Sequence, residues 1–212
     1  MKSDLAVVIL AAGKGTRMES DKPKVLHKID NKSLIEHVVL TTKKLFPQKI
    51  IVVVGYKFEL IKENLKKINL NYALQEQQNG TGHAVMQCHK QLKKFDGNTL
   101  ILSGDVPLIN YETLQRMHDA HIKTQSAATI LTADFKNPFG YGRIIKKNND
   151  FSFIKEEKDA TKEEKEINEI NAGIYIFNNK TLFKHIKRIS NNNNQKEYYL
   201  PDVFPFIIKN KQ

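Results

Sequence analysis

LAVVILAAGKGTRM (residues 5–18) joins a short apolar run to a glycine-rich, cationic loop. The apolar half is rich in β-branched residues, which is typical of a strand buried in a parallel sheet, and ligands bind beyond the carboxyl ends of such strands. Gly13 and Gly15 lack the side chains that would keep the backbone from an oxyanion, and successive N–H groups in such a turn form an anion-binding concavity. Arg17 and Lys24 add positive charge. The stretch therefore predicts a polyphosphate site, and a lysine-rich turn that is merely solvated is the alternative.

Two familiar glycine motifs do not fit this loop. A Walker A loop would need glycine at Val8 and Ser or Thr at Gly15. The dinucleotide fingerprint would need a third glycine at Met18. The predicted phosphate site is therefore of another kind.

Composition favours a cytoplasmic protein. The 212 residues suffice for one domain with a small lobe. The single cysteine, Cys88, cannot form an internal disulfide, which suits a reducing compartment, and its apolar neighbours favour a core position over a nucleophilic role. The longest apolar run, Leu5–Ala12, is too short to cross a bilayer, so no membrane partner is expected.

The net charge of +11 has two interpretations. Excess lysine can mark a nucleic-acid binder or an enzyme whose substrates carry several negative charges. The lysines here are spread along the chain, on polar faces of expected helices as at Lys62, Lys66 and Lys67, and no aromatic residues interleave with them. We therefore expect a solvated surface and no nucleic-acid partner.

The alternation of apolar segments predicts an α/β fold, with a Rossmann-like, mostly parallel sheet flanked by helices and a small antiparallel lobe after Asp134. Ser33 and Glu36 have capping-box spacing at the start of a helix that runs to about Leu45. The other expected helices lie at 58–67, 82–92 and 201–208, with one more that buries Leu114, Met117 and Ile122. The other expected strands lie at 50–54, 71–74, 100–103, 127–131, 144–147, 151–155 and 172–177, with a hairpin turn at 148–150.

Two further segments carry candidate chemistry. Gln75 precedes Gly80-Thr81-Gly82 at a strand-to-helix junction, and its amide offers the donor and acceptor that match uracil. An ordinary helix start capped by Thr81 is the alternative. Asp105 follows a buried strand, where a carboxylate suits Mg²⁺, although aspartate before a turn is also a common cap. His118 and His121 lie three apart on an expected helix without a third ligand, so we expect a solvated face there.

The loop at residues 10–18 resembles that of sugar-1-phosphate nucleotidyltransferases, which join a nucleoside triphosphate to a sugar phosphate and release pyrophosphate. An ordered set of motifs then resembles the bacterial N-acetylglucosamine-1-phosphate uridylyltransferase domain over essentially the whole chain. The motifs are residues 75–84, Gly104-Asp105-Val106-Pro107, Tyr141-Gly142-Arg143, Glu156 in KEEKDA, Asn171 in EINAGI, and Glu197-Tyr198-Tyr199-Leu200-Pro201-Asp202.

The resemblance implies an enzyme that uses UTP, N-acetylglucosamine 1-phosphate and Mg²⁺ to make UDP-N-acetylglucosamine, a cell-wall precursor, and pyrophosphate. It implies that residues 1–212 form one nucleotidyltransferase domain, with 1–133 mainly binding nucleotide and 134–212 mainly binding sugar. It assigns the nucleotide to Leu10, Ala11, Ala12, Gly13, Gln75, Gly80 and Thr81, the sugar to Gly142, Glu156 and Asn171, the metal to Asp105, and the phosphates to Arg17 and Lys24.

Two family features have no counterpart here. A second metal ligand, an asparagine, lies further beyond the Tyr-Tyr-x-x-Asp segment than this sequence extends, so either the domain is truncated, or another residue or a water takes that place, or activity is impaired. The acetyltransferase β-helix that forms the family's trimer is also missing, so a monomer is one expected state and the oligomeric state stays open. Three alternatives stay open. They are a uridylyl- or thymidylyltransferase for another hexose 1-phosphate, a guanylyltransferase acting on molybdopterin, and a catalytically silent nucleotide-sugar-binding domain.

Overall fold

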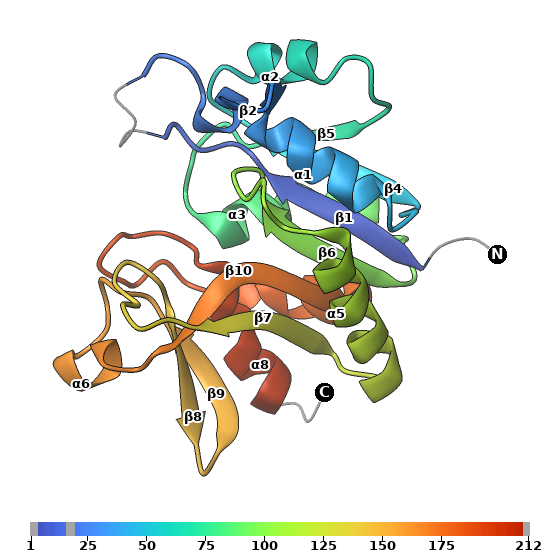
Figure 1. Ribbon diagram of the computed structural model, residues 1–212. Coiled ribbons are helices and arrows are strands. Elements are labelled where there is room, and N and C mark those ends of the chain that lie inside the picture. Colours follow the sequence, from blue (N-terminus) through green and yellow to red (C-terminus); the bar gives the residue numbers. More distant parts are fainter. Residues whose placement is uncertain (1–3, 16–19, 210–212) are drawn as a thin grey trace.

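A computed structural model describes residues 4–15 and 20–209 of the chain. Its centre is one twisted sheet with the strand order β5-β4-β1-β6-β10-β8-β9, with β7 also pairing with β10 (Figure 1). The parallel part comprises β1 (Leu5–Leu10), β4 (Lys49–Val54), β5 (Asn71–Leu74) and β6 (Asn98–Ser103). The antiparallel part comprises β7 (Ala128–Asp134), β8 (Arg143–Lys147), β9 (Asp150–Lys155) and β10 (Glu169–Asn178). The predicted α/β fold with a mostly parallel sheet and an antiparallel portion is confirmed.

Helices cover both faces of the sheet, and each face has its own apolar core. One core packs Val7 and Ile9 of β1 against α1 (Leu34–Lys43), α2 (Phe58–Asn64) and α5 (Tyr111–Thr124). The other packs Ala6 and Val8 against α3 (Thr81–Met86), α4 (His89–Leu92), α7 (Asn179–His185) and α8 (Phe204–Lys209). Because β1 is covered on both sides, its side chains are apolar at every position, as its sequence indicates.

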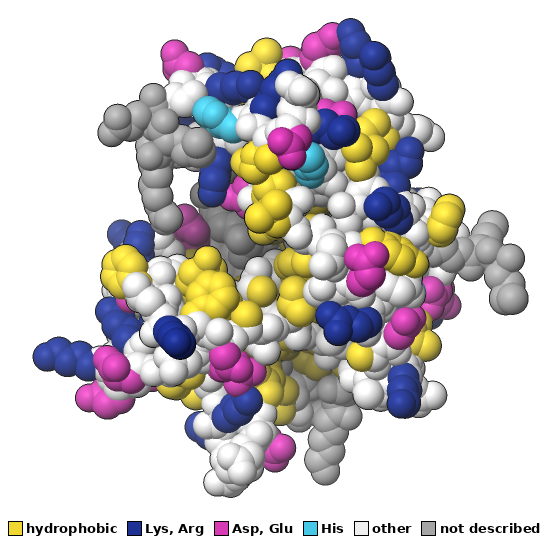
Figure 2. All heavy atoms as spheres, in the orientation of Figure 1, with side chains coloured by type: hydrophobic (Ala, Val, Ile, Leu, Met, Phe, Trp, Pro, Cys, Tyr) yellow, Lys and Arg dark blue, Asp and Glu magenta, His cyan; other side chains and the backbone are white. Residues whose placement is uncertain are grey.

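Short elements complete the chain. They are η2 (Lys24–Leu26), the hairpin β2 (Lys28–Ile29) and β3 (Lys32–Ser33), α6 (Lys162–Lys165), η3 (Ile186–Arg188) and η4 (Leu200–Val203). Within the described residues, no helix combines the length and apolar character that a bilayer crossing requires. On the face seen in Figure 2, lysine and arginine side chains are scattered among acidic ones and do not gather into one patch.

The start of α1 and the β8–β9 hairpin confirm the local sequence signals. Ser33 is the N-cap of α1, and its hydroxyl accepts a hydrogen bond from the backbone N–H of Glu36. The hairpin turns at Asn148 and Asn149, which both have positive φ, as a tight two-residue turn requires.

Three predicted helices differ from the structure. The helix expected at 82–92 is divided into α3 and α4 at Gln87 and Cys88, and the helix expected to reach residue 67 ends at Asn64. The helix expected at 201–208 begins with the 3-10 turn η4, and only α8 is α-helical. Cys88 is fully buried in the core, as expected.

The interpretation of α5 is also corrected. Ile122 is 45% exposed and His121 is 2% exposed, the reverse of the expectation for this helix. The ring of His121 lies 2.8 Å from Thr129 Oγ1 through Nδ1 and 3.1 Å from Asn98 Oδ1 through Nε2. These polar partners, supplied by β7 and β6, offset the cost of burying an imidazole. The expected solvated face at His118 and His121 is therefore wrong.

Candidate active site

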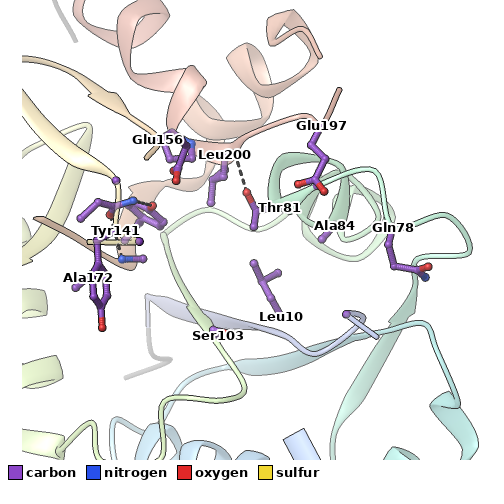
Figure 3. A pocket seen from close by; sticks show the side chains of 18 of the residues that line it. Leu10, Gln78, Thr81, Ala84, Ser103, Tyr141, Glu156, Ala172, Glu197 and Leu200 are labelled. Atoms are coloured by element: carbon purple, nitrogen blue, oxygen red, sulfur yellow. Dashed lines mark hydrogen bonds between the residues drawn. The ribbon is translucent and has the colours of Figure 1, made fainter. Parts of the chain in front are cut away.

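A cavity of about 480 Å³ opens at the carboxyl ends of β1 and β6, between the two parts of the sheet. Figure 3 shows Leu10 and Ser103 on one side of it, Leu200 and Glu156 on the other, and Gln78 and Tyr141 toward opposite ends. Eight of the residues predicted from the sequence line this cavity. They are Leu10, Gly13, Gln75, Gly80, Thr81, Gly142, Glu156 and Asn171.

The predicted phosphate loop borders the cavity through Gly13. A Cβ atom on Gly13 would have no heavy atom within 4 Å, so the backbone there faces open space. Gly15 has φ +64°, and a Cβ atom on it would lie 2.7 Å from Lys24 Cβ, so the turn requires glycine. Ala11 and Ala12 are buried and do not line the cavity. The N–H of Ala11 donates to Val53 O at 2.8 Å and continues the ladder between β1 and β4. Arg17 lies outside the described residues.

Gln75, Gly80 and Thr81 meet at the start of α3. Gln75 is 3% exposed, and its Nε2 donates to Gly80 O at 3.1 Å. Gly80 has φ +102°, and a Cβ atom there would lie 2.6 Å from Tyr198 O. Thr81 does not cap the helix, because the N-cap is Gly80. The hydroxyl of Thr81 instead accepts the N–H of Leu200 at 3.0 Å and fastens η4 to α3 (Figure 3).

Asp105 follows the end of β6, next to the cavity. Its Oδ2 lies 2.6 Å from Lys24 Nζ, and its Oδ1 accepts the hydroxyl of Ser103 at 2.5 Å. Burial alone would raise the pKa of Asp105, but the hydrogen bonds from Lys24 and Ser103 outweigh it and lower that pKa. Two residues with predicted phosphate and metal roles therefore form an ion pair, and neither lines the cavity, although Ser103 does.

Gly142, Glu156 and Asn171 come together on the antiparallel side. A Cβ atom on Gly142 would lie 3.2 Å from Glu156 Oε1, so glycine leaves room for that carboxyl. Burial raises the pKa of Glu156, and the charges of Asp202, Asp159 and Glu197 raise it further. This end of the cavity therefore carries a polar acceptor in an acidic surrounding.

Asn171 is held by a β-bulge in β10. The register of β10 against β7 shifts between Asn171 and Tyr175, and Gly173 within the bulge has φ +72°. Asn171 Nδ2 donates to the hydroxyl of Tyr175 at 2.7 Å, and Asn171 Oδ1 accepts the N–H of Gly173 at 3.0 Å. β-Bulges often change the direction of a side chain near a functional site, and this bulge holds the Asn171 amide in the wall of the cavity.

Sequence reasoning missed several residues that line the cavity, among them Gln78, Tyr141, Tyr175 and Glu197. Tyr141 and Glu197 lie in motifs quoted above without an assigned role. Gly173, two residues before Tyr175, is a glycine inside a strand, which is a signal for a bulge. Within the described residues, no group of three or more His, Cys, Asp or Glu side chains is arranged to hold a metal ion. The carboxylate of Asp105 is the kind of hard oxygen ligand that could hold Mg²⁺, because that ion binds one or two carboxylates together with substrate phosphates and waters.

Three comparisons relate the chain to known proteins. The family model described as nucleotidyl transferase matches residues 6–212. A protein named "Bifunctional protein GlmU" from Streptococcus uberis is 48% identical over 207 residues, which are 97% of this chain and 45% of that protein. A protein of the same name from Streptococcus thermophilus is 48% identical over 204 residues, which are 96% of this chain and 44% of that protein. The chain thus spans less than half the length of these relatives.

Among solved structures, a UDP-glucose pyrophosphorylase complexed with UDP-glucose superposes with a TM-score of 0.78 at 18% sequence identity. The superposition covers 99% of this chain and 88% of that chain. At this identity the likeness concerns the fold alone.

Proposed function

The chain belongs to the nucleotidyl transferase family, and on that premise we propose that it transfers a uridylyl group from UTP to N-acetylglucosamine 1-phosphate. The products are UDP-N-acetylglucosamine and pyrophosphate. One observation carries the proposal: a single cavity is lined by Gly13 of the loop, by Gln75 and Gly80 near α3, and by Glu156 and Asn171 on the antiparallel strands. Relatives with 48% identity that are named as bifunctional proteins support the assignment of this chain to one part of such an enzyme.

The reaction requires alignment more than it requires a base. A phosphate oxygen of the sugar phosphate attacks the α-phosphorus of UTP, the bond from that phosphorus to the bridging oxygen breaks, and pyrophosphate leaves. Since the second pKa of a phosphate monoester is about 6, the attacking group is already ionised at neutral pH. The protein must hold two anions that repel each other and neutralise the charge that grows on pyrophosphate.

The cationic groups for this task are Arg17 and Lys24. Lys24 already lies against Asp105, at the same edge of the sheet as Gly13. Asp105 would hold Mg²⁺, which when bound neutralises phosphate charge. Losing a well-placed donor to a developing charge costs on the order of 10²–10³ in rate.

The two ends of the cavity would bind different parts of the substrates. Gln75, Gly80 and Thr81 would contact the uracil, while Gly142, Glu156 and Asn171 would contact the amino sugar. This division is supported by the positions of Gln78, between Gln75 and Gly80 in the sequence, and of Tyr141, next to Gly142, which lie toward opposite ends of the cavity (Figure 3). Residues 1–133 would then act mainly on the nucleotide and residues 134–212 mainly on the sugar.

The test is pyrophosphate release by the purified chain with Mg²⁺. UTP is compared with ATP, CTP, GTP and dTTP, and N-acetylglucosamine 1-phosphate with glucose 1-phosphate. Release confined to UTP and the N-acetylated sugar is the expected result. Lys24→Ala should lower kcat about 10²-fold with an unchanged circular dichroism spectrum. Thermal stabilisation by UDP-N-acetylglucosamine without any pyrophosphate release would contradict the proposed transfer and identify a binding domain.

A further inference from the structure

Two neighbouring acceptors together orient the side-chain amide of Gln75. Its nitrogen Nε2 lies 3.1 Å from Gly80 O, and a carbonyl oxygen can only accept a hydrogen bond, so the NH₂ group must face Gly80. The same nitrogen lies 3.1 Å from Nδ1 of His83. Both hydrogens of the NH₂ group are therefore directed at protein acceptors. The backbone of Gln75 is fixed as well, because its N–H donates to Val54 O at 2.8 Å.

The imidazole of His83 must consequently be an acceptor at Nδ1. A proton on Nδ1 would point at the NH₂ group of a residue that is only 3% exposed, which leaves neither donor a partner. The geometry therefore places a ring proton on Nε2 and leaves Nδ1 as the acceptor. The ring is further ordered by Tyr198, whose centroid lies 6.4 Å away.

Gln87 competes for the same imidazole from the other side. Its Nε2 lies 3.2 Å from His83 Nε2 and donates to His83 O at 3.0 Å. A neutral imidazole has one acceptor nitrogen and cannot serve both amides. Gln87 is half-buried and can turn toward water, whereas Gln75 cannot, so the tautomer that satisfies Gln75 is the more stable one.

We propose that His83 is a positioning residue that holds the Gln75 amide with its oxygen toward the cavity and thereby sets a preference for uracil over cytosine. The inference rests on the proposed function, in which Gln75 faces the base. With Nε2 committed to Gly80 and His83, Oε1 is the group that Gln75 offers to a ligand. Uracil presents an N3–H donor to such an oxygen. Cytosine presents an unprotonated N3, whose lone pair opposes the lone pairs of Oε1.

The experiment compares His83→Leu with His83→Asn. The atom that replaces histidine Nδ1 is bonded to Cγ in both variants. In asparagine it is the acceptor oxygen Oδ1, and in leucine it is a methyl carbon. Affinities for UTP and CTP are measured by calorimetry in the absence of sugar phosphate, and kcat/KM is measured for both nucleotides with it. We expect His83→Leu to lower the UTP-to-CTP ratio about fivefold to tenfold, the effect of one hydrogen bond. His83→Asn should keep the ratio within about twofold of the parent.

Gln87→Leu is the matched control, because it removes the competing amide and should leave the ratio unchanged. General damage to the fold lowers both affinities and leaves their ratio intact, so the ratio reports positioning. An unchanged ratio in His83→Leu overturns the inference, as does an equal loss in His83→Asn. Equal binding of UTP and CTP by the parent overturns it too. A parent that prefers UTP but releases no pyrophosphate contradicts the proposed transfer and leaves the role of His83 standing.

Discussion

Single residues around the cavity are held by neighbours that belong to other elements or to irregular backbone. Asn171 shows this most clearly, because both ends of its amide are engaged, by Tyr175 and by Gly173. Burial raises the pKa of Tyr175 above the ordinary tyrosine value, so its hydroxyl is protonated at neutral pH. The orientation of the Asn171 amide thus depends on a tyrosine that also lines the cavity.

Tyr175→Phe should weaken sugar recognition selectively. The substitution leaves the NH₂ group of buried Asn171 without its acceptor, which costs about the free energy of one hydrogen bond. We expect KM for N-acetylglucosamine 1-phosphate to rise about three- to tenfold while KM for UTP stays within about twofold. Steady-state kinetics with each substrate varied in turn measure both values. Tyr72→Phe, on β5 and away from the cavity lining, serves as the control, and an equal rise in both KM values would count against a positioning role.

The raised pKa of Asp202 predicts that the free energy of unfolding depends on pH. Burial, and then the nearby charge of Asp159, raise the pKa of Asp202 from 3.8 to about 6, although Lys155 opposes the shift. The folded state therefore holds the proton more tightly than the unfolded state, and the ionised carboxylate destabilises the fold above pH 6. This penalty shrinks as the pH falls from about 6 to about 4.

Asp202→Asn should accordingly stabilise the protein at pH 8 by about 1–2 kcal/mol, a value reduced from the full shift because the carboxyl is partly exposed. At pH 4 the gain should nearly vanish. Urea unfolding of both proteins at the two pH values measures the difference. Since the charge of Asp202 also raises the pKa of Glu156, the variant should lower that pKa as well. A gain that is the same at pH 4 and pH 8 would refute this explanation.

At the level of elements, the sequence predicted best where one local pattern determines the structure. The β-branched run of β1, the Ser33 cap of α1 and the Asn148-Asn149 turn each lie within a few residues of what they specify. The parts that could not be predicted depend on distant contacts. The burial of His121 needs Asn98 and Thr129 as partners, and the tight start of α3 depends on the segment around Tyr198.

The docking of α3 against that segment predicts the effect of Gly82→Ala. A Cβ atom there would lie 2.4 Å from Ile189 Cδ1 and 3.0 Å from Tyr198 O, and the backbone atom cannot move as easily as the side chain. We expect a loss of stability of about 1–3 kcal/mol, the usual cost of overpacking. Urea denaturation is the measurement. Gly13→Ala is the matched control, because its Cβ atom meets open space and should leave stability unchanged. Equal stabilities of the two variants would show that α3 can shift to accommodate the methyl group.

For the whole molecule, the proposed division into a nucleotide half and a sugar half does not correspond to two folding units. Strand β10, which comes after residue 133, pairs with β6, which comes before it, so both halves share one sheet. The core on the α3 side likewise combines Val8 and Val85 with Phe177 and Phe204. Neither half keeps a closed core or a protected sheet edge without the other.

The chain should therefore unfold in one cooperative transition. Because the sequence has no tryptophan, tyrosine fluorescence and far-ultraviolet circular dichroism are the suitable probes, and their urea transitions should coincide. A fragment of residues 1–133 should be expanded or aggregated, since it exposes the β6 edge that β10 covers and loses the apolar side chains of α7 and α8. Two separated transitions, or a fragment with a cooperative transition of its own, would show that the halves are folding units. In that case the cavity would lie between two domains free to move against each other, and substrate binding would have to include the cost of closing them.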